Sequence, residues 1–145
     1  MSATPDAAAA LQVPARYAHA VDNDDLEALA GCFVEDAALE VEVRGTEHRR
    51  VHRGRAAILD LFRASFAAHR VRRHIVSSVV LESLTAGEAR IRSYVTVLSI
   101  DGESLQPSAS GVYEDLAVAY GGQWRIKLRR GIFDTSAVLR STFFQ

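Results

Sequence analysis

The chain contains 145 residues, of which 48% are hydrophobic and 24% are charged, and its formal net charge is -1. This length and composition are typical of one globular domain, so we expect a single domain over residues 1–145. The near-neutral charge argues against nucleic acid as a partner, and the lack of an apolar run of about 20 residues argues against a membrane.

The N-terminal segment MSATPDAAAA contains an acidic residue and no basic region, so it does not resemble a signal peptide. Cys32 is the single cysteine and has no partner for an internal disulfide. Both features predict a cytoplasmic protein. We expect residues 1–12 to be a frayed terminus.

The first half of the chain is predicted to be mainly helical. Tyr17, Ala18 and Val21 have the spacing of one helix face. Asp24 or Asp25 can cap a second helix. The expected helices are Ala15–Val21, Leu26–Phe33 and Arg55–Ala68, and the expected strands between them are Ala38–Val43 and Arg49–His52.

The second half is predicted to form strands joined by short turns, with Asp101-Gly102 as a hairpin signal. The expected strands are His74–Glu82, Ala89–Ile100, Leu105–Ala119 and Gln123–Phe133. Helices followed by a meander predict the α+β class: a curved antiparallel sheet with N-terminal helices packed on one face, forming a cone-shaped cavity. Residues 134–145 are expected to be a C-terminal tail.

Three acidic residues, Asp22, Asp24 and Asp25, follow the first predicted helix. One of them can cap the next helix, and another can point inward, where a carboxylate needs a partner. His74 begins a strand whose two faces are both apolar, so alternation does not place its side chain. By itself, His74 would be an ordinary strand-end histidine in solvent or bonded to a backbone carbonyl.

Two arginines follow Trp124 in the segment QWRIKLRRGIF. Simple alternation places Arg130 inward and Arg129 outward, and a β-bulge would reverse this assignment. Tyr113 is expected in the core.

The basic run HRVRRH, residues 69–74, lacks interleaved aromatic residues, so we expect a solvated loop rather than a nucleic-acid site. His48 and His52 could share a face only on a helix, and their segment reads as a strand, so no metal site is predicted.

Four segments resemble, in order and spacing, the SnoaL-like branch of the nuclear transport factor 2-like superfamily: RYAHAVDNDDLEALAGCFVEDA, HRGRAAILDLF, HIVSSVVLE and SGVYEDLAVAYGGQWRIKLRR. The likeness covers roughly residues 13–133. Dehydratases and dehydrochlorinases of this type share an Asp–His dyad, which the resemblance places at Asp22 and His74. It places a pocket tyrosine at Tyr17 and an arginine at Arg129, with Arg130 as the fallback.

The resemblance implies a cofactor-independent lyase or isomerase, of the dehydratase, isomerase or cyclase type, acting on a small hydrophobic cyclic substrate such as a steroid or polyketide. Asp22 would orient His74 as general base, Tyr17 would donate to a substrate oxygen or protonate a leaving hydroxyl, and Arg129 would stabilise an enolate. No cofactor and no metal are required, and a homodimer is the family expectation. Further substrate contacts are expected from Phe33, Phe62, Ser78, Tyr113 and Arg130.

Two other hypotheses stay open at this level. The domain could bind a ligand in the same cavity without turning it over, since no substrate-specific motif is present. It could also be a structural dimerisation domain, because curved sheets of this type commonly pair through their open face. The tail SAVLRSTFFQ could close the pocket mouth, pack on a partner subunit or pack on its own sheet.

Overall fold

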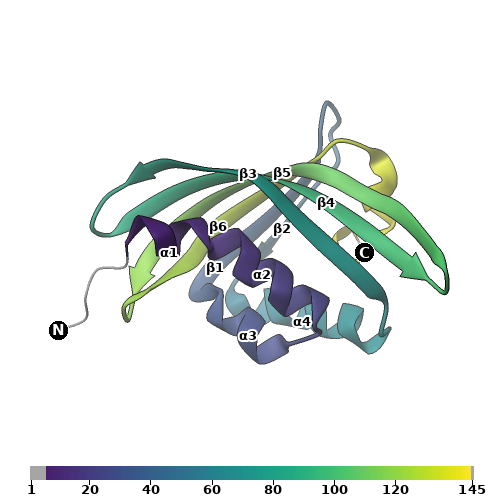
Figure 1. Ribbon diagram of the computed structural model, residues 1–145, viewed down its shortest axis with the longest axis horizontal. Coiled ribbons are helices and arrows are strands. Elements are labelled where there is room, and N and C mark those ends of the chain that lie inside the picture. Colours follow the sequence, from purple (N-terminus) through teal and green to yellow (C-terminus); the bar gives the residue numbers. More distant parts are fainter. Residues whose placement is uncertain (1–5, 145) are drawn as a thin grey trace.

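A six-stranded sheet arches over the N-terminal helices in the computed structural model, which describes residues 6–144 (Figure 1). The helices are α1 Ala7–Leu11, α2 Val13–Asp22, α3 Leu26–Gly31 and α4 Arg55–Ala67. The strands are β1 Phe33–Val43, β2 Arg49–Arg53, β3 Val71–Leu84, β4 Glu88–Asp101, β5 Ser104–Tyr120 and β6 Gln123–Phe133. Two short 3-10 helices, η1 Ser136–Arg140 and η2 Thr142–Phe144, complete the described chain.

The sheet has the strand order β2-β1-β6-β5-β4-β3. Strands β3 to β6 form the predicted antiparallel meander, and β1 joins it by pairing in parallel with β6. The helices lie against one face of the curved sheet (Figure 1). The predicted α+β class with helices on one face of a curved sheet is therefore confirmed. None of the helices within residues 6–144 is long and apolar enough to cross a bilayer.

Helix α1 lies within the segment that was expected to be frayed. The Asp6 side chain caps it by accepting from the Ala9 N–H at 2.8 Å, and Ala10 is fully buried. The indole Nε1 of Trp124 donates to the Asp6 carbonyl at 3.0 Å, which ties the helix to β6. The prediction is wrong for residues 7–11, because a cap and a long-range anchor order this helix. Residues 1–5 lie outside the described part of the chain.

The second predicted helix is shorter than expected, and the strand after it is longer. Helix α3 ends at Gly31, and Phe33 already pairs with Ile126 of β6 as the first residue of β1. Phe33 is fully buried, so tertiary packing decides its conformation over local helix propensity.

The basic run at residues 69–74 was expected to be a solvated loop. Strand β3 begins at Val71, so this prediction is wrong from Val71 onward. Within it the side chains alternate: Arg72 and His74 point inward and are partly buried, whereas Val71 and Arg73 are exposed. The strand thereby brings His74 to the helix side of the sheet.

Two of the irregularities in the sheet, one on β6 and one on β3, change which predicted site residues face the helices. On β6, Leu128 pairs with Leu116 and Ile126 with Ala117, so Lys127 is an extra residue. On β3, Ser77 pairs with Tyr94 and Val80 with Arg92, so this strand also carries an extra residue. Each bulge shifts the alternation by one residue, which sequence alternation alone does not predict.

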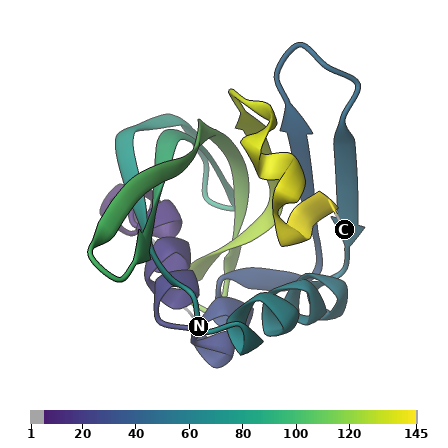
Figure 2. The ribbon, with the colours of Figure 1, turned by 90° about the vertical axis from the view of Figure 1, so that its right-hand side faces the viewer.

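The C-terminal tail packs back onto its own chain, beside α4 and β2 (Figure 2). The Phe143 ring lies 5.6 Å from that of Phe62, and the Phe143 carbonyl is 3.1 Å from Nε2 of His52. The Arg50 guanidinium lies over the Phe144 ring at 5.6 Å. The tail thus contacts both α4 and the sheet of its own chain, and its role at a pocket mouth or a partner subunit stays a prediction; Gln145 lies outside the described residues.

Candidate active site

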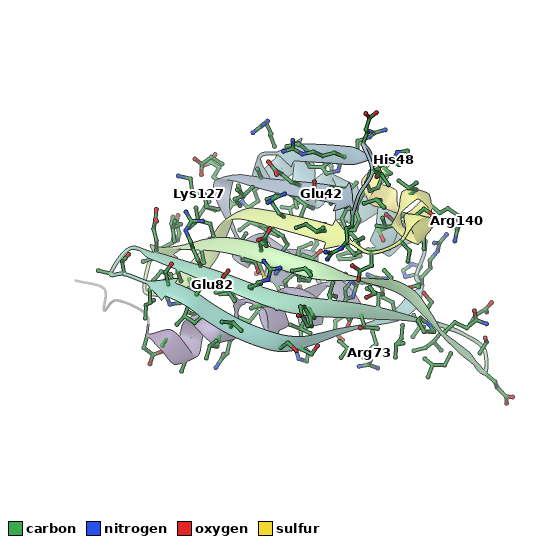
Figure 3. All side chains as sticks on the ribbon, turned by 90° about the horizontal axis from the view of Figure 1, so that it is seen from above. Glu42, His48, Arg73, Glu82, Lys127 and Arg140 are labelled. Atoms are coloured by element: carbon green, nitrogen blue, oxygen red, sulfur yellow. The ribbon has the colours of Figure 1, made fainter. Side chains whose placement is uncertain are left out.

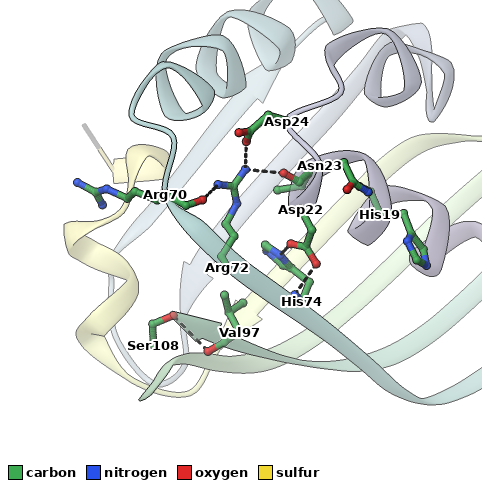
Figure 4. Close-up of polar contacts among 10 residues, drawn as sticks. His19, Asp22, Asn23, Asp24, Arg70, Arg72, His74, Val97 and Ser108 are labelled. Atoms are coloured by element: carbon green, nitrogen blue, oxygen red, sulfur yellow. Dashed lines mark hydrogen bonds and ion pairs between the residues drawn. The ribbon is translucent and has the colours of Figure 1, made fainter. Parts of the chain in front are cut away.

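Asp22 and His74 form the hydrogen-bonded dyad that the resemblance implied (Figure 4). The Nδ1 atom of His74 lies 2.6 Å from Oδ1 of Asp22, and the backbone N–H of His74 donates to Oδ2 at 2.8 Å. Both carboxylate oxygens therefore bind the same residue. Each side chain keeps 10% of its surface exposed, so the dyad is shielded but still touches solvent.

The three acidic residues at the end of α2 and just after it each bind a different partner. Asp22 is the last residue of α2 and faces β3. Asp25 caps α3, with its carboxylate accepting from the Ala28 N–H at 2.9 Å. Asp24 adopts a positive φ of 52° and binds Arg72 at 2.9 Å. The inward carboxylate and the helix cap are thus Asp22 and Asp25.

The pKa of Asp22 lies below its ordinary value of 3.8. Burial is the largest influence and by itself would raise this pKa, because it disfavours the charged form. The hydrogen bonds from the His74 ring and backbone, together with the charges of His74 and Arg72, outweigh that influence. Asp22 is therefore a carboxylate at neutral pH, with one oxygen at the His74 ring and the other at its backbone N–H.

Arg129 is fully buried beside the dyad and forms a two-pronged ion pair with Asp115 of β5. Its Nε donates to Oδ1 at 2.7 Å and its Nη2 to Oδ2 at 2.8 Å. The guanidinium carbon lies 4.1 Å from the Tyr17 ring centroid and 3.9 Å from that of Tyr113. The third nitrogen, Nη1, is buried and has no hydrogen-bond partner within the described residues.

The two tyrosines beside Arg129 are neutral phenols at physiological pH. Burial raises the pKa of Tyr113 to about 12 and that of Tyr17 well above its ordinary value of 10. Arg129 stays charged: burial would lower its pKa, but the Asp115 carboxylate raises it further. The site thus combines a fixed cation with two phenol hydroxyls that keep their protons.

An aromatic wall surrounds Tyr17. Its ring meets Phe33 at 6.2 Å, Phe62 at 5.9 Å, Tyr113 at 6.0 Å and His74 at 6.3 Å, all in edge-to-face geometry. These residues come from α2, β1, α4, β5 and β3, so elements far apart in the sequence meet at this wall. The structure therefore brings together the four predicted catalytic residues and three predicted contacts, Phe33, Phe62 and Tyr113.

Two predicted contacts lie elsewhere. Ser78 sits at the β3 bulge with a φ of 52° and is exposed, so the bulge removes it from the inner face. Arg130 points to the outer face of the sheet, where it binds Glu42 at 2.8 Å and Glu114 at 3.1 Å. Figure 3 views that outer face and labels Glu42. The Lys127 bulge is the reason: it turns Arg129 inward and Arg130 outward, against simple alternation.

Three polar residues of this region were not predicted. Asp115 follows Tyr113 by two residues on β5, and Arg72 precedes His74 by two on β3, so strand alternation could have placed each beside a predicted residue. Ser93 of β4 is fully buried, and its hydroxyl has no partner among the described residues. No sequence signal distinguishes it.

Two hollows on the described part of the chain are lined by residues other than Asp22 and His74. The larger, about 440 Å³, lies between α2, α3 and the start of β6 and includes Arg16, His19, Cys32 and Trp124. Burial raises the pKa of the Cys32 thiol to about 11, so it is not a reactive thiolate. The smaller, about 140 Å³, lies on the outer face of the sheet beside Arg130. Around the dyad, Tyr17, Phe33, Phe62 and Tyr113 belong to one buried hydrophobic cluster.

A family model described as a SnoaL-like domain matches residues 2–130. No curated protein matches the chain significantly. A variant of Rv3472, a protein of unknown function from Mycobacterium tuberculosis, is 31% identical, has a TM-score of 0.75, and the match covers 88% of this chain and 70% of that one. A candidate scytalone dehydratase from Novosphingobium aromaticivorans is 25% identical with a TM-score of 0.72, covering 88% and 83%. An NTF2-like protein with a cystatin-like fold from the same organism is 25% identical with a TM-score of 0.71, covering 97% and 89%.

Proposed function

This chain belongs to the SnoaL-like domain family, and from that membership we propose that it is a cofactor-independent lyase or isomerase. Its substrate would be a small, hydrophobic cyclic ketone of the steroid or polyketide type. The observation that carries the proposal is the bond between Asp22 and His74, in which one carboxylate accepts both the ring and the backbone N–H of the histidine. The likeness to a candidate scytalone dehydratase supports the same class of chemistry.

The general base is His74. With its proton held on Nδ1 by Asp22, its Nε2 can take a proton from a carbon next to a carbonyl, and the electron pair of the broken C–H bond forms an enolate. Asp22 stabilises the imidazolium that results. The enolate then expels a β-hydroxyl, which takes the proton from the His74 imidazolium and leaves as water (elimination), or it accepts that proton back at another carbon (isomerisation).

The enolate oxygen needs hydrogen-bond donors, and Arg129 and Tyr17 are suited to that role. Arg129 has one buried nitrogen, Nη1, that Asp115 does not bind. A preorganised donor in a site shielded from water stabilises developing negative charge strongly. The raised pKa of Tyr17 favours hydrogen-bond donation over full proton transfer.

The proposal is tested with a panel of cyclic ketones that carry either a β-hydroxyl or an isolated double bond, following the absorbance of the conjugated product. We expect His74→Gln to lower kcat about 100- to 10,000-fold. His48→Gln, an exposed histidine on the far hairpin, should leave kcat unchanged (Figure 3). Full turnover in a folded His74→Gln variant would refute the assignment.

We also propose that the protein is a homodimer that pairs through the outer face of the sheet. Large apolar side chains stand on that face uncovered by any described segment: Val71, Ile75, Val80, Tyr94 and Leu105, each 44% to 60% exposed. Exposed apolar patches of this kind mark protein interfaces. Cytoplasmic localisation stays a prediction, to be checked by cell fractionation.

A further inference from the structure

Arg72 is an inward-facing arginine on the strand that carries His74. The two residues are separated by one position of β3, so their side chains share a face, while their neighbours Val71 and Arg73 are exposed. The Arg72 side chain keeps only 12% of its surface exposed. It lies beside the dyad but forms no hydrogen bond to His74 or to the Asp22 carboxylate in the described structure.

The guanidinium of Arg72 connects three segments, and Figure 4 shows its bonds to Asp24 and Arg70. Its Nη2 donates to the backbone carbonyl of Val21 and to Oδ1 of Asp24, the latter at 2.9 Å. Its Nη1 donates to the carbonyl of Arg70 at 3.0 Å. Its carbon lies 5.3 Å from the ring centroid of Phe66 in α4. One side chain therefore links β3 to the end of α2 and to α4.

The two anchor points, one in the last turn of α2 and one in the turn after it, flank the Asp22 carboxylate. Val21 immediately precedes Asp22, and Asp24 follows two residues later. Asp24 has a positive φ of 52°, a conformation that residues with a Cβ rarely adopt, and its side chain is held by Arg72. The turn that presents Asp22 is thus fixed on one side at Val21 and on the other at Asp24, independently of the bonds that Asp22 makes to His74.

We propose that Arg72 is a positioning residue that acts through Asp22: by clamping the C-terminal turn of α2 to β3, it holds the Asp22 carboxylate where it binds both N–H groups of His74. Its catalytic consequence rests on the proposed function, whereas its effect on the dyad geometry does not. A misplacement of about 1 Å in such a group lowers turnover about a hundredfold.

Arg72→Met tests the clamp, because methionine keeps an unbranched side chain that can pack on Phe66 and removes every hydrogen bond. Arg73→Met is the matched control, since Arg73 is the next residue, carries the same charge and is exposed (Figure 3). The readout is the imidazole Nδ1–H proton of His74, observed by NMR in protein labelled with ¹⁵N-histidine and assigned with His74→Gln.

We expect this proton to exchange with water at least about tenfold faster in Arg72→Met than in the unmodified chain, and at an unchanged rate in Arg73→Met. Arg72→Lys keeps the charge but cannot reach both Val21 and Asp24 in the same geometry, so the exchange rate of the His74 proton should be intermediate in this variant. If Arg72→Met does not fold, Arg72→Lys replaces it as the test. An unchanged rate in Arg72→Met or in Arg72→Lys would overturn the clamp.

Kinetics add a second, separable readout once a substrate has been found. We expect Arg72→Met to lower kcat about ten- to a hundredfold with little change in KM, because Arg72 does not touch the substrate. An Arg72→Met enzyme with normal kcat would overturn the positioning role. A chain without activity on any tested ketone would count against the proposed function and leave the exchange result standing.

Discussion

At the scale of single residues, two carboxylates in the interior each bind one partner in a two-pronged way. Asp22 accepts two N–H groups of His74, and Asp115 accepts two of Arg129. Tyr17 connects the two pairs, with its ring facing both Arg129 and His74. Because each acid has a different partner, the site has an imidazole at one end and a buried guanidinium at the other.

The lowered pKa of Asp22 predicts a specific pH dependence of stability. A carboxyl whose pKa is lower in the folded state stabilises the fold above its ordinary value of 3.8, and this contribution disappears as the pH falls through the folded value. We expect Asp22→Asn to cost about 1–3 kcal/mol of unfolding free energy at neutral pH. Urea unfolding of both proteins should show a constant gap down to about pH 5 and a shrinking gap below about pH 4. A gap that persists or widens in acid would contradict the ionised, bonded Asp22.

The buried pair Arg129–Asp115 and the surface pair Arg130–Glu114 occupy adjacent positions of the same two strands, which makes them matched tests. Asp115→Asn should lower the free energy of unfolding by about 3–5 kcal/mol, because it leaves a fully buried guanidinium without its counter-ion. Glu114→Gln should cost at most about 1 kcal/mol, since its partners Arg92 and Arg130 are each more than 40% exposed. If Asp115→Asn and Glu114→Gln lowered the free energy of unfolding equally in denaturant titrations, Arg129 would not be a buried cation that depends on Asp115.

At the scale of elements, the sequence predicted which segments are helices and strands better than it predicted which side chains face inward. Periodicity located α2, α4 and the four strands of the meander within a few residues. The bulges at Lys127 and near Ser78 reversed the facing of the residues after them, and nothing local distinguishes an extra residue in a strand from a regular one. For Arg129 the family resemblance supplied the correct face, and for Ser78 it did not.

Helix α1 and the start of β1 were missed for a related reason. Asp6 binds Trp124, and Phe33 pairs with Ile126, both across more than ninety positions of sequence. Contacts of that range override local propensity and are not visible in a single segment.

The C-terminal tail gives a prediction at this scale. Phe143 packs on Phe62, which in turn contacts Tyr17, whereas Phe144 meets Arg50 near the surface. We expect Phe143→Ala to lower the free energy of unfolding by roughly 1–3 kcal/mol and to change the rate of ligand association. Phe144→Ala is the control, and it should change both the free energy of unfolding and the rate of ligand association less than Phe143→Ala does. Identical ligand association rates for the two variants in stopped-flow experiments would refute a role of the tail at the site.

At the scale of the whole molecule, the helices cover one face of the sheet, and no described helix covers the other face (Figure 1). We expect Tyr94→Asp to shift the proposed dimer to monomer in sedimentation velocity experiments, because it places a charge in the middle of the apolar patch. Tyr120→Asp is matched in exposure, 55% against 52%, but lies at the end of β5, and it should leave the dimer intact. A monomer in the unmodified protein, or a dimer in Tyr94→Asp, would refute pairing through this face.

The central claim is that His74, oriented by Asp22, removes a proton next to a carbonyl. The most direct measurement follows deuterium incorporation at that carbon by NMR, with cyclic ketones in D₂O, because proton abstraction is detected even where no group leaves. We expect deuterium incorporation with the unmodified protein, incorporation at least about 100-fold slower with His74→Gln or Asp22→Asn, and an unchanged rate with His48→Gln. Incorporation at the same rate in folded His74→Gln would contradict it.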